Sequence, residues 1–185
     1  DAEGFYAIGG AGVNHNGNFT FDNEDYRYCT RRAIKACVSN VEVKNSYFEE
    51  IPESMFNKAQ QMGSMLDFFS TRSGQNIKNI RINNNVIRTV PGNNAHYYLL
   101  SMTEVEDAIV EDNVITMENL HTYSGIRLGS NTSTYNGDLK DVVIRNNTLN
   151  NTYMQAMQNY NPNNALDINN NTFNWTSTLG YQIGA

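Results

Sequence analysis

Residues 79–87 read Asn79-Ile-Arg-Ile-Asn-Asn-Asn-Val-Ile87, and this nine-residue pattern decides the fold because it recurs along the chain without an internal gap. Five further segments align with it: Asn18–Tyr26, Asn40–Phe48, Asp107–Ile115, Asp141–Leu149 and Ala165–Phe173. The first apolar positions of the six units are Phe19, Val41, Ile80, Ala108, Val142 and Leu166, so the intervals between units are unequal. Recurrence at intervals of roughly 20–50 residues is typical of a solenoid, in which extra residues are inserted as loops between units.

Each unit alternates apolar and polar residues before a fixed corner. Ile80, Ile82 and their equivalents are apolar, whereas their neighbours are mostly polar, which is the pattern of a half-buried strand. Asn84 is Asn or Asp in every unit, and a short side chain that bonds local backbone favours a turn there. Ile87 is apolar in every unit. The pattern therefore predicts a strand, a corner and a second wall.

A second strand-like segment precedes each unit, as in Met65–Phe69, His96–Leu100 and Gly125–Leu128. No two-residue Asn-Gly turns join these segments to the units, so hairpins are disfavoured and each turn of the chain should stack on the next in parallel. We expect two strands per turn and about seven turns. In the longest interval between units, the helical spacing of apolar residues and Pro52 predict one short helix, inserted at about residues 49–64.

Units of strand, asparagine corner and strand, such as Ala33–Phe48, resemble the right-handed parallel β-helix proteins of the pectate-lyase-like kind. The resemblance covers residues 4–185 and implies an all-β solenoid. That family includes polysaccharide lyases, glycoside hydrolases, polysaccharide epimerases and phage tailspikes, so the resemblance implies a carbohydrate partner and an extracellular or virion-surface location without choosing a reaction. The sequence matches no catalytic motif of the family.

Composition and charge restrict the classes of binding partner. The net charge is −6 and no basic cluster is longer than Arg31-Arg32, which disfavours nucleic acid and anionic membranes. No run approaches the roughly 20 apolar residues of a membrane span. Hydrophobic residues make up 39% of the chain, and asparagine is almost as frequent as all charged residues together, which fits one folded domain over residues 1–185. Because the start lacks a signal peptide and the end reads as a strand in progress, we expect a fragment or processed product of a longer chain.

Acid–base or elimination chemistry on a polysaccharide requires carboxylates or bases in a groove. The candidate catalytic residues lie in or beside the second set of strands and in the long loop that follows the fourth unit: Asp67, Glu104, Glu118, His121 and Arg127. In a lyase, Arg127 and His121 would supply a base and neutralise a uronate. The alternative for this group is a solvated surface.

Aromatic and metal-binding residues give weaker signals. Four tyrosines are candidates for stacking on sugar rings, with corner packing as the alternative: Tyr97, Tyr98, Tyr123 and Tyr153. The three histidines are isolated from one another and no Cys-x-x-Cys occurs, so zinc is disfavoured and no cofactor is expected. Calcium stays open through Asp22, Glu24 and Asp25. Cys29 and Cys37 are expected to be free thiols.

Stacking places equivalent residues about 4.8 Å apart on neighbouring turns. On the strand of the repeat, this predicts three cross-turn charge pairs: Asp22–Lys44, Glu42–Arg81 and Glu111–Arg145. On the other strand, an inward count from Phe69 and Leu100 leaves Phe68 and Leu99 in an outward apolar stripe. A stripe of this kind would be covered by a homotrimer or by the remainder of a parent chain. The alternative is a one-residue register error, which would swap the inward and outward sets.

Three functions remain open. The first is recognition and depolymerisation of a polysaccharide by a tailspike or a secreted lyase or hydrolase. The second is a non-catalytic glycan-binding adhesin, and the third is a structural shaft. Tyrosine-rich loops and long insertions favour recognition over a bare shaft.

Overall fold

The computed structural model describes residues 5–7, 16–29, 32–52, 62–70, 75–91, 96–118, 124–129, 139–156 and 166–175. Within these ranges every regular element is a β-strand, which confirms the all-β class. None of the described residues belongs to a helix that could cross a membrane.

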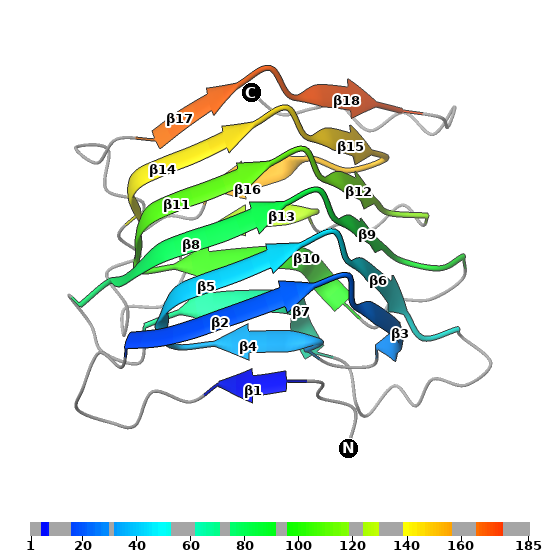
Figure 1. Cartoon of the computed structure of the whole chain (residues 1–185). Helices are drawn as coiled ribbons and strands as arrows, with labels where there is room; N and C mark the ends of the chain where they lie inside the picture. The colour runs from blue at the N-terminus through cyan, green and yellow to red at the C-terminus, as the bar shows by residue number, and fades with distance from the viewer. Residues whose placement is uncertain are drawn as a thin grey trace.

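The eighteen strands of the described ranges form three sheets, and each sheet takes one strand from every turn of the chain (Figure 1). Sheet A contains β1 (Phe5–Ala7), β4 (Ile34–Ala36), β7 (Met62–Phe69), β10 (His96–Thr103), β13 (Ile126–Leu128) and β16 (Met154–Ala156). Sheet B contains β2 (Asn16–Asp22), β5 (Ser39–Lys44), β8 (Ile77–Asn83), β11 (Val105–Glu111), β14 (Leu139–Arg145) and β17 (Leu166–Asn169). Sheet C contains β3 (Asp25–Cys29), β6 (Tyr47–Glu50), β9 (Val86–Arg88), β12 (Val114–Thr116), β15 (Thr148–Asn150) and β18 (Thr172–Asn174).

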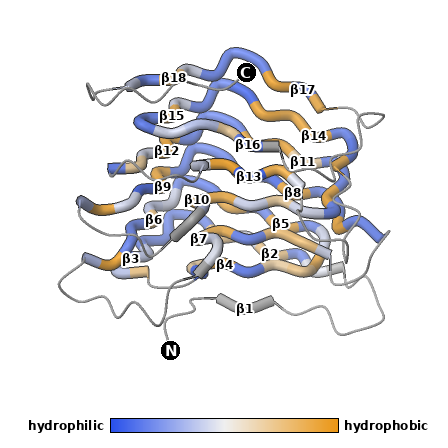
Figure 2. The backbone as a smooth tube through the Cα atoms, turned by 180° about the vertical axis from the view of Figure 1, so that it is seen from behind, coloured by the Kyte–Doolittle hydropathy of each residue, from blue (hydrophilic) through white to orange (hydrophobic). Residues whose placement is uncertain are grey.

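All strand pairs in the three sheets are parallel, and every strand pairs with its equivalents one turn away. Sheets A and B form opposite walls, as the front and back views make clear (Figures 1 and 2). This arrangement is a stack consistent with a parallel β-helix, with six turns in the described residues. Each turn has three strands rather than the expected two, because the second wall of the repeat is a short strand of its own. The seventh turn, expected at residues 181–183, lies outside the described residues.

The register of sheet B follows the repeat on every rung. The predicted inward column is confirmed, with each member paired to the next: Phe21, Val43, Ile82, Val110, Ile144 and Ile168. Phe21 is 8% exposed and the next four members are fully buried, whereas Ile168 is 46% exposed on the last rung. The buried members of this column belong to the one hydrophobic core cluster that fills the stack.

The corner between sheets B and C is left-handed on every rung. Six residues have φ between 52° and 59°: Asn23, Asn45, Asn84, Asp112, Asn146 and Asn170. Asn and Asp tolerate this conformation better than other residues with a Cβ, because their short polar side chains bond nearby backbone. The predicted asparagine turn is therefore confirmed.

A buried amide ladder lies one residue beyond the asparagine turn. Asn84 lies at the surface, whereas Asn85, Asn113 and Asn147 are fully buried. The Nδ2 of Asn85 donates to Oδ1 of Asn113 at 2.9 Å, and Asn113 donates in the same way to Asn147. Asn113 also donates to the carbonyl of Ile82. The left-handed turn directs the Asn84 side chain outward, where its Nδ2 donates to Oδ1 of Asn45 at 2.7 Å, and directs the next side chain inward.

The described residues do not show the apolar stripe that was predicted outside sheet A. Phe68 and Leu99 are fully buried. Phe68 pairs with Met102 in an inward column. The sequence pattern had assigned the inward position to Phe69, one residue further along the strand. Leu99 and Leu100 are both fully buried and both belong to the core cluster, so strict alternation of inward and outward side chains does not hold within β10. The stripe was the argument for a trimer or a covering segment, and that argument no longer applies.

The short helix expected at about residues 49–64 is not seen. Glu49 and Glu50 lie in β6, and residues 62–64 lie in β7. Residues 53–61, the centre of the expected helix, lie outside the described residues.

Two of the three predicted charge pairs form. Lys44 lies 4.0 Å from Asp22, and Arg145 lies 2.7 Å from Glu111. Glu42 binds Lys44 at 2.8 Å instead of Arg81. A pair within a strand has replaced the predicted cross-turn pair at this position.

Replacing Asn113 with Ala should destabilise the stack. The change leaves the backbone N–H of Asn85 and the carbonyl of Ile82 without their buried partner, at about 1–3 kcal/mol for each unsatisfied group. Urea unfolding followed by circular dichroism measures the loss. The matched control is Asn84→Gly, which keeps the positive φ and removes an amide at the surface, so it should change the free energy of unfolding by under about 0.5 kcal/mol. Equal effects of the two variants would show that the ladder does not stabilise the fold.

Cys29 and Cys37 are free thiols, as expected, and both should resist alkylation in the native protein. Burial raises the pKa of Cys29 to about 12 and that of Cys37 to about 11, so almost no reactive thiolate is present at a mildly alkaline pH. Mass spectrometry after iodoacetamide treatment should find both thiols unmodified in buffer and both modified in guanidinium chloride. Rapid labelling of either thiol in buffer would contradict the burial.

Candidate functional site

The outward face of sheet A carries a polar column. One residue from each of five successive strands lies in register: Lys35, Asp67, Ser101, Arg127 and Gln155. These residues alternate with buried inward residues such as Leu66 and Phe68, which fixes their direction. The column contains two cations, one carboxylate, one hydroxyl and one amide.

Arg127 is held against an aromatic ring. Its guanidinium carbon lies 4.9 Å from the centre of the Tyr98 ring, a cation–π contact. Burial raises the pKa of Tyr153, and Tyr98 raises that pKa further. Tyr98 and Tyr153 lie on the same side of the stack, because the backbone N–H of Leu99 donates to the carbonyl of Gly125 and the backbone N–H of Gly125 donates to the carbonyl of Tyr153. Among the described residues, the buried Nε of Arg127 has no hydrogen-bond partner. Buried donors are normally bonded in native proteins, so this nitrogen is an exception.

Asp67, the second residue of the column, forms an ion pair. The Nε of Arg32 donates to Oδ2 of Asp67 at 2.8 Å, and the two side chains are 19% and 10% exposed. Lys35 lies 5.6 Å from the centre of the Phe69 ring. Among the described residues, three cations therefore accompany one carboxylate on this face, although the chain as a whole has a net charge of −6.

Ser101 lies between Asp67 and Arg127 in the column. The residue is fully buried, and its Oγ has no hydrogen-bond partner among the described residues. A hydroxyl, a guanidinium and two phenols at one place can bond hydroxyl groups, pair with a carboxylate and stack on a flat ring. These are the contacts that an acidic sugar requires.

Four of the predicted site residues thus gather on one face of the molecule: Asp67, Arg127, Tyr98 and Tyr153. Sequence reasoning did not select Arg32, Lys35 or Ser101. The repeat pattern could have found Lys35 and Ser101, because the correct register of sheet A places both in the column of Asp67 and Arg127.

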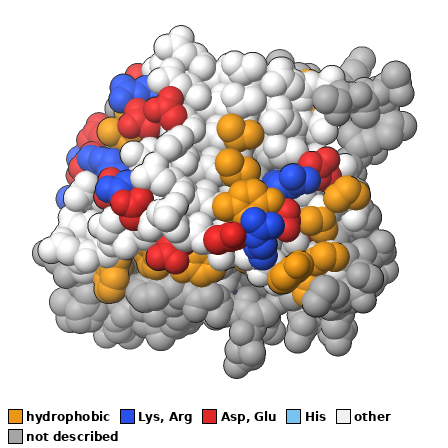
Figure 3. All heavy atoms as spheres, turned by 45° about the vertical axis from the view of Figure 1, so that its right-hand side comes forward, with side chains coloured by type: hydrophobic (Ala, Val, Ile, Leu, Met, Phe, Trp, Pro, Cys, Tyr) orange, Lys and Arg blue, Asp and Glu red, His pale blue; other side chains and the backbone are white. Residues whose placement is uncertain are grey.

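The other predicted site residues do not join this group in the described structure. Glu104 is fully buried at a corner after β10, with φ of 55°. Glu118 follows β12 and pairs with Arg88 at 2.8 Å on the side of sheet C, where acidic and basic side chains intermix (Figure 3). Tyr97 lies in β10, but its side chain lies outside the described structure, as do His121 and Tyr123 entirely.

No three His, Cys, Asp or Glu residues of the described ranges come close enough to hold a metal ion. In the acidic turn considered for calcium, Asp25 pairs with Arg27 at 2.9 Å and Asp22 accepts a hydrogen bond from Asn45.

The class of protein defined by the fold is an all-β stack of parallel strands consistent with a parallel β-helix. The sequence matches no family model and no curated protein, and no solved structure matches the chain.

Glu106, beside the candidate Glu104, belongs to an ion cluster on sheet B. Lys78 and Lys140, on the rungs to either side, approach its carboxylate to 3.1 and 3.2 Å. Burial acts to raise the pKa of Glu106, but the two lysines outweigh burial and hold that pKa below its ordinary value. The resulting contribution to stability is present near neutral pH and is lost as the pH falls through the lowered pKa.

Replacing both Lys78 and Lys140 with Met should raise the pKa of Glu106 above its ordinary value, because only the effect of burial then remains. A pH titration of the Glu106 side-chain carboxyl carbon by NMR measures the change. Lys44→Met, elsewhere on sheet B, should leave the pKa of Glu106 unchanged. No upward shift in the double variant would show that the two lysines do not control this carboxylate.

Proposed function

We propose that this chain is a right-handed parallel β-helix that binds an acidic polysaccharide along the outward face of sheet A. The strands of sheet B run to the right in the front of Figure 1, those of sheet A run to the left behind them, and successive turns rise toward the C-terminus, which supports the right-handed sense. A right-handed crossover is also the rule for parallel strands. A polysaccharide partner implies a location outside the cell or on a virion.

The observation that carries the proposal is the group formed by Arg127, Tyr98, Tyr153 and Ser101. A buried guanidinium nitrogen and a buried hydroxyl lack partners among the described residues, and a phenol ring lies against the guanidinium. Ser101 is fully buried, so the half-buried side chains of Arg127, Tyr98 and Tyr153 are the parts of this group that a ligand reaches. The excess of cations over carboxylates on this face favours an anionic ligand, with a uronate as the acidic sugar.

The lengths of the loops also support sheet A as the binding face. The connection from sheet B to sheet C is two residues on every rung. The connections from sheet C to sheet A vary from the short segment 151–153 to the long segment 51–61. Those from sheet A to sheet B vary from Glu104 alone to the segment 129–138. Variable loops on a rigid scaffold are the usual carriers of binding function, and in this chain they flank sheet A alone on both sides.

Depolymerisation is the second candidate function. Asp67 is the only carboxylate of the five-residue column and is already paired with Arg32, whereas hydrolysis normally uses two carboxylates. Elimination is the better match, since Arg127 would neutralise the uronate while a base removes the proton next to its carboxylate. Binding requires only the residues of the face itself, so it is the function proposed first.

Arg127→Met should weaken binding of acidic polysaccharides at least about tenfold, because it removes both the charge and the ring contact. Tyr98→Ala should weaken binding by a smaller factor. Affinity electrophoresis in gels containing pectate, alginate, hyaluronan or bacterial capsular polysaccharides measures the effect. Arg145→Met is the matched control, because Arg145 is a paired arginine on sheet B, and its binding should equal that of the unchanged protein.

Binding that is insensitive to Arg127→Met would place the polysaccharide on another face. Failure of every polysaccharide to retard the unchanged protein would favour the structural shaft. The same samples, assayed for reducing ends and for the absorbance of unsaturated uronates, separate hydrolysis, elimination and binding without cleavage.

A further inference from the structure

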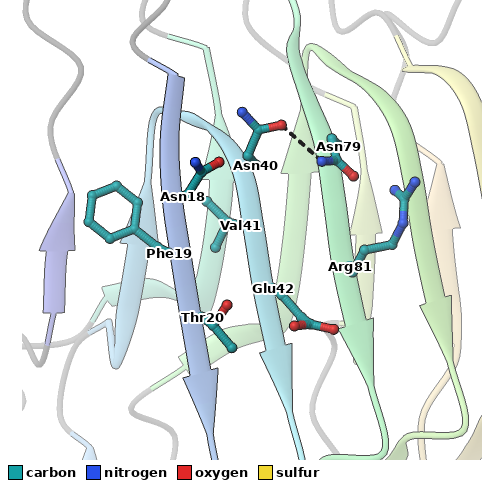
Figure 4. A pocket seen from close by; sticks show the side chains of 8 residues that line it. All are labelled: Asn18, Phe19, Thr20, Asn40, Val41, Glu42, Asn79 and Arg81. Carbon is teal, nitrogen blue, oxygen red and sulfur yellow. Dashed lines mark hydrogen bonds between the residues drawn. The ribbon is translucent and has the colours of Figure 1, made fainter.

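A hollow of about 240 Å³ lies on the outer surface of sheet B, on the wall opposite the proposed polysaccharide face (Figures 1 and 4). It crosses strands β2, β5 and β8 at the start of the stack. Six polar side chains line it: Asn18, Thr20, Asn40, Glu42, Asn79 and Arg81. None of them belongs to the group on sheet A.

The hollow exists because two charged side chains bind partners other than each other. Glu42 and Arg81 are neighbours in register, and a direct pair would bridge the gap between their strands. Instead Lys44 binds Glu42 at 2.8 Å, and Arg81 donates to the carbonyl and to the carboxylate of Asp107 on the following rung at 2.7 and 2.9 Å. The space between Glu42 and Arg81 therefore stays open.

A row of amides forms one side of the hollow. Asn40 and Asn79 have φ of 60° and 57° within their strands, and the Nδ2 of Asn79 donates to Oδ1 of Asn40 at 2.8 Å. This bond leaves the donors of Asn40 and the acceptor of Asn79 available. The side chains of Asn18 and Thr20 are exposed and make no hydrogen bond within the described residues. At the next rungs the row continues as Asp107 and Asp141, so the amides are confined to this end.

Charge and size restrict the ligand. Glu42 is neutralised by Lys44, and Arg81 by Asp107, so the hollow offers amide and hydroxyl groups without a net charge. Its volume is below the roughly 300–1,000 Å³ that is typical for pockets of drug-sized ligands. Amides and hydroxyls that both donate and accept are suited to a small molecule with several hydroxyl groups.

We propose that this hollow is a second saccharide site, which binds a single neutral sugar ring independently of the acidic polysaccharide face. The amides of Asn18, Asn40 and Asn79 bond neighbouring hydroxyls of the ring. The hydroxyl of Thr20 and the carboxylate oxygen of Glu42 that Lys44 does not bind bond hydroxyls on the other side of the ring (Figure 4). The two walls then select different sugars, because sheet A presents more cations than carboxylates, whereas the charges of Arg81 and Glu42 in the hollow are neutralised by Asp107 and Lys44.

NMR with the full ¹⁵N-labelled chain tests the proposal directly. Glucose, galactose, mannose and N-acetylglucosamine are the neutral probes, and glucuronate is the charged counterpart of glucose. At least one neutral sugar should shift the side-chain amide signals of Asn18, Asn40 and Asn79 in a saturable way, and glucuronate should bind there no more tightly than glucose. Arg127→Met should leave this binding unchanged, which separates the hollow from the sheet A face.

Asn40→Gly retains the positive φ and should raise the dissociation constant about threefold to tenfold, the loss of one or two neutral hydrogen bonds. Thr20→Val, which removes an exposed hydroxyl at constant size, should weaken binding in the same direction. The matched control is Asp141→Gly, at the equivalent left-handed position three rungs above Asn40, which should change the dissociation constant less than twofold. The proposal is overturned if no neutral sugar shifts the three amides, if glucuronate binds there more tightly, or if Asp141→Gly weakens binding as much as Asn40→Gly.

Discussion

The corner between sheets B and C is a two-residue turn whose first residue is Asn or Asp on every rung and whose second residue is Asn on four of the six rungs, and the rest of the stack depends on that corner. The first member, such as Asn84, takes the left-handed conformation, and the second, such as Asn85, turns inward and bonds the amide of the next rung. Both the side-chain nitrogen and the backbone N–H of Asn85 donate to the same oxygen of Asn113. A shift of one residue would expose this amide and bury its neighbour without a partner, so the corner fixes the register of both sheets that it joins.

A fixed inner corner leaves the outer positions free. Inside the stack, the column of sheet B that contains Val43 and Ile82 holds Phe, Val or Ile on every rung. Outside, five successive rungs of sheet A present lysine, aspartate, serine, arginine and glutamine. The stack can therefore change its surface chemistry from rung to rung without disturbing its core, which is how a repetitive fold acquires a local site.

The repeat unit predicted sheet B and its corner correctly, because the positions within the nine-residue unit are the same on every rung. It predicted sheet A less well, because the number of residues between the unit and the sheet A strand differs from rung to rung. Val43 and Ile82 lie in one column as the pattern requires. In sheet A, however, two consecutive side chains of one strand are buried in the core, as at Leu99 and Leu100, and strict alternation no longer gives the correct face. In sheet B the repeat unit fixes which residue faces inward. The connections before the strands of sheet A vary in length, so no fixed position identifies the inward residues there. Without such a position, Phe68 was assigned to the outside.

The group on sheet A and the hollow on sheet B also differ in how far the sequence predicts them. Arg127 and Tyr98 were selected singly from the sequence, but their contact depends on parallel pairing of β10 with β13, which the repeat predicts only in outline. The hollow on sheet B was not predictable from pairing alone, since Arg81 had two acidic residues within reach. Asp107 can offer both a carboxylate and a carbonyl to its guanidinium, whereas Glu42 already accepts a bond from Lys44 in its own strand. Two charge-assisted bonds to one partner outweigh a single pair with a carboxylate that is already neutralised, and the choice opens the surface between the two strands.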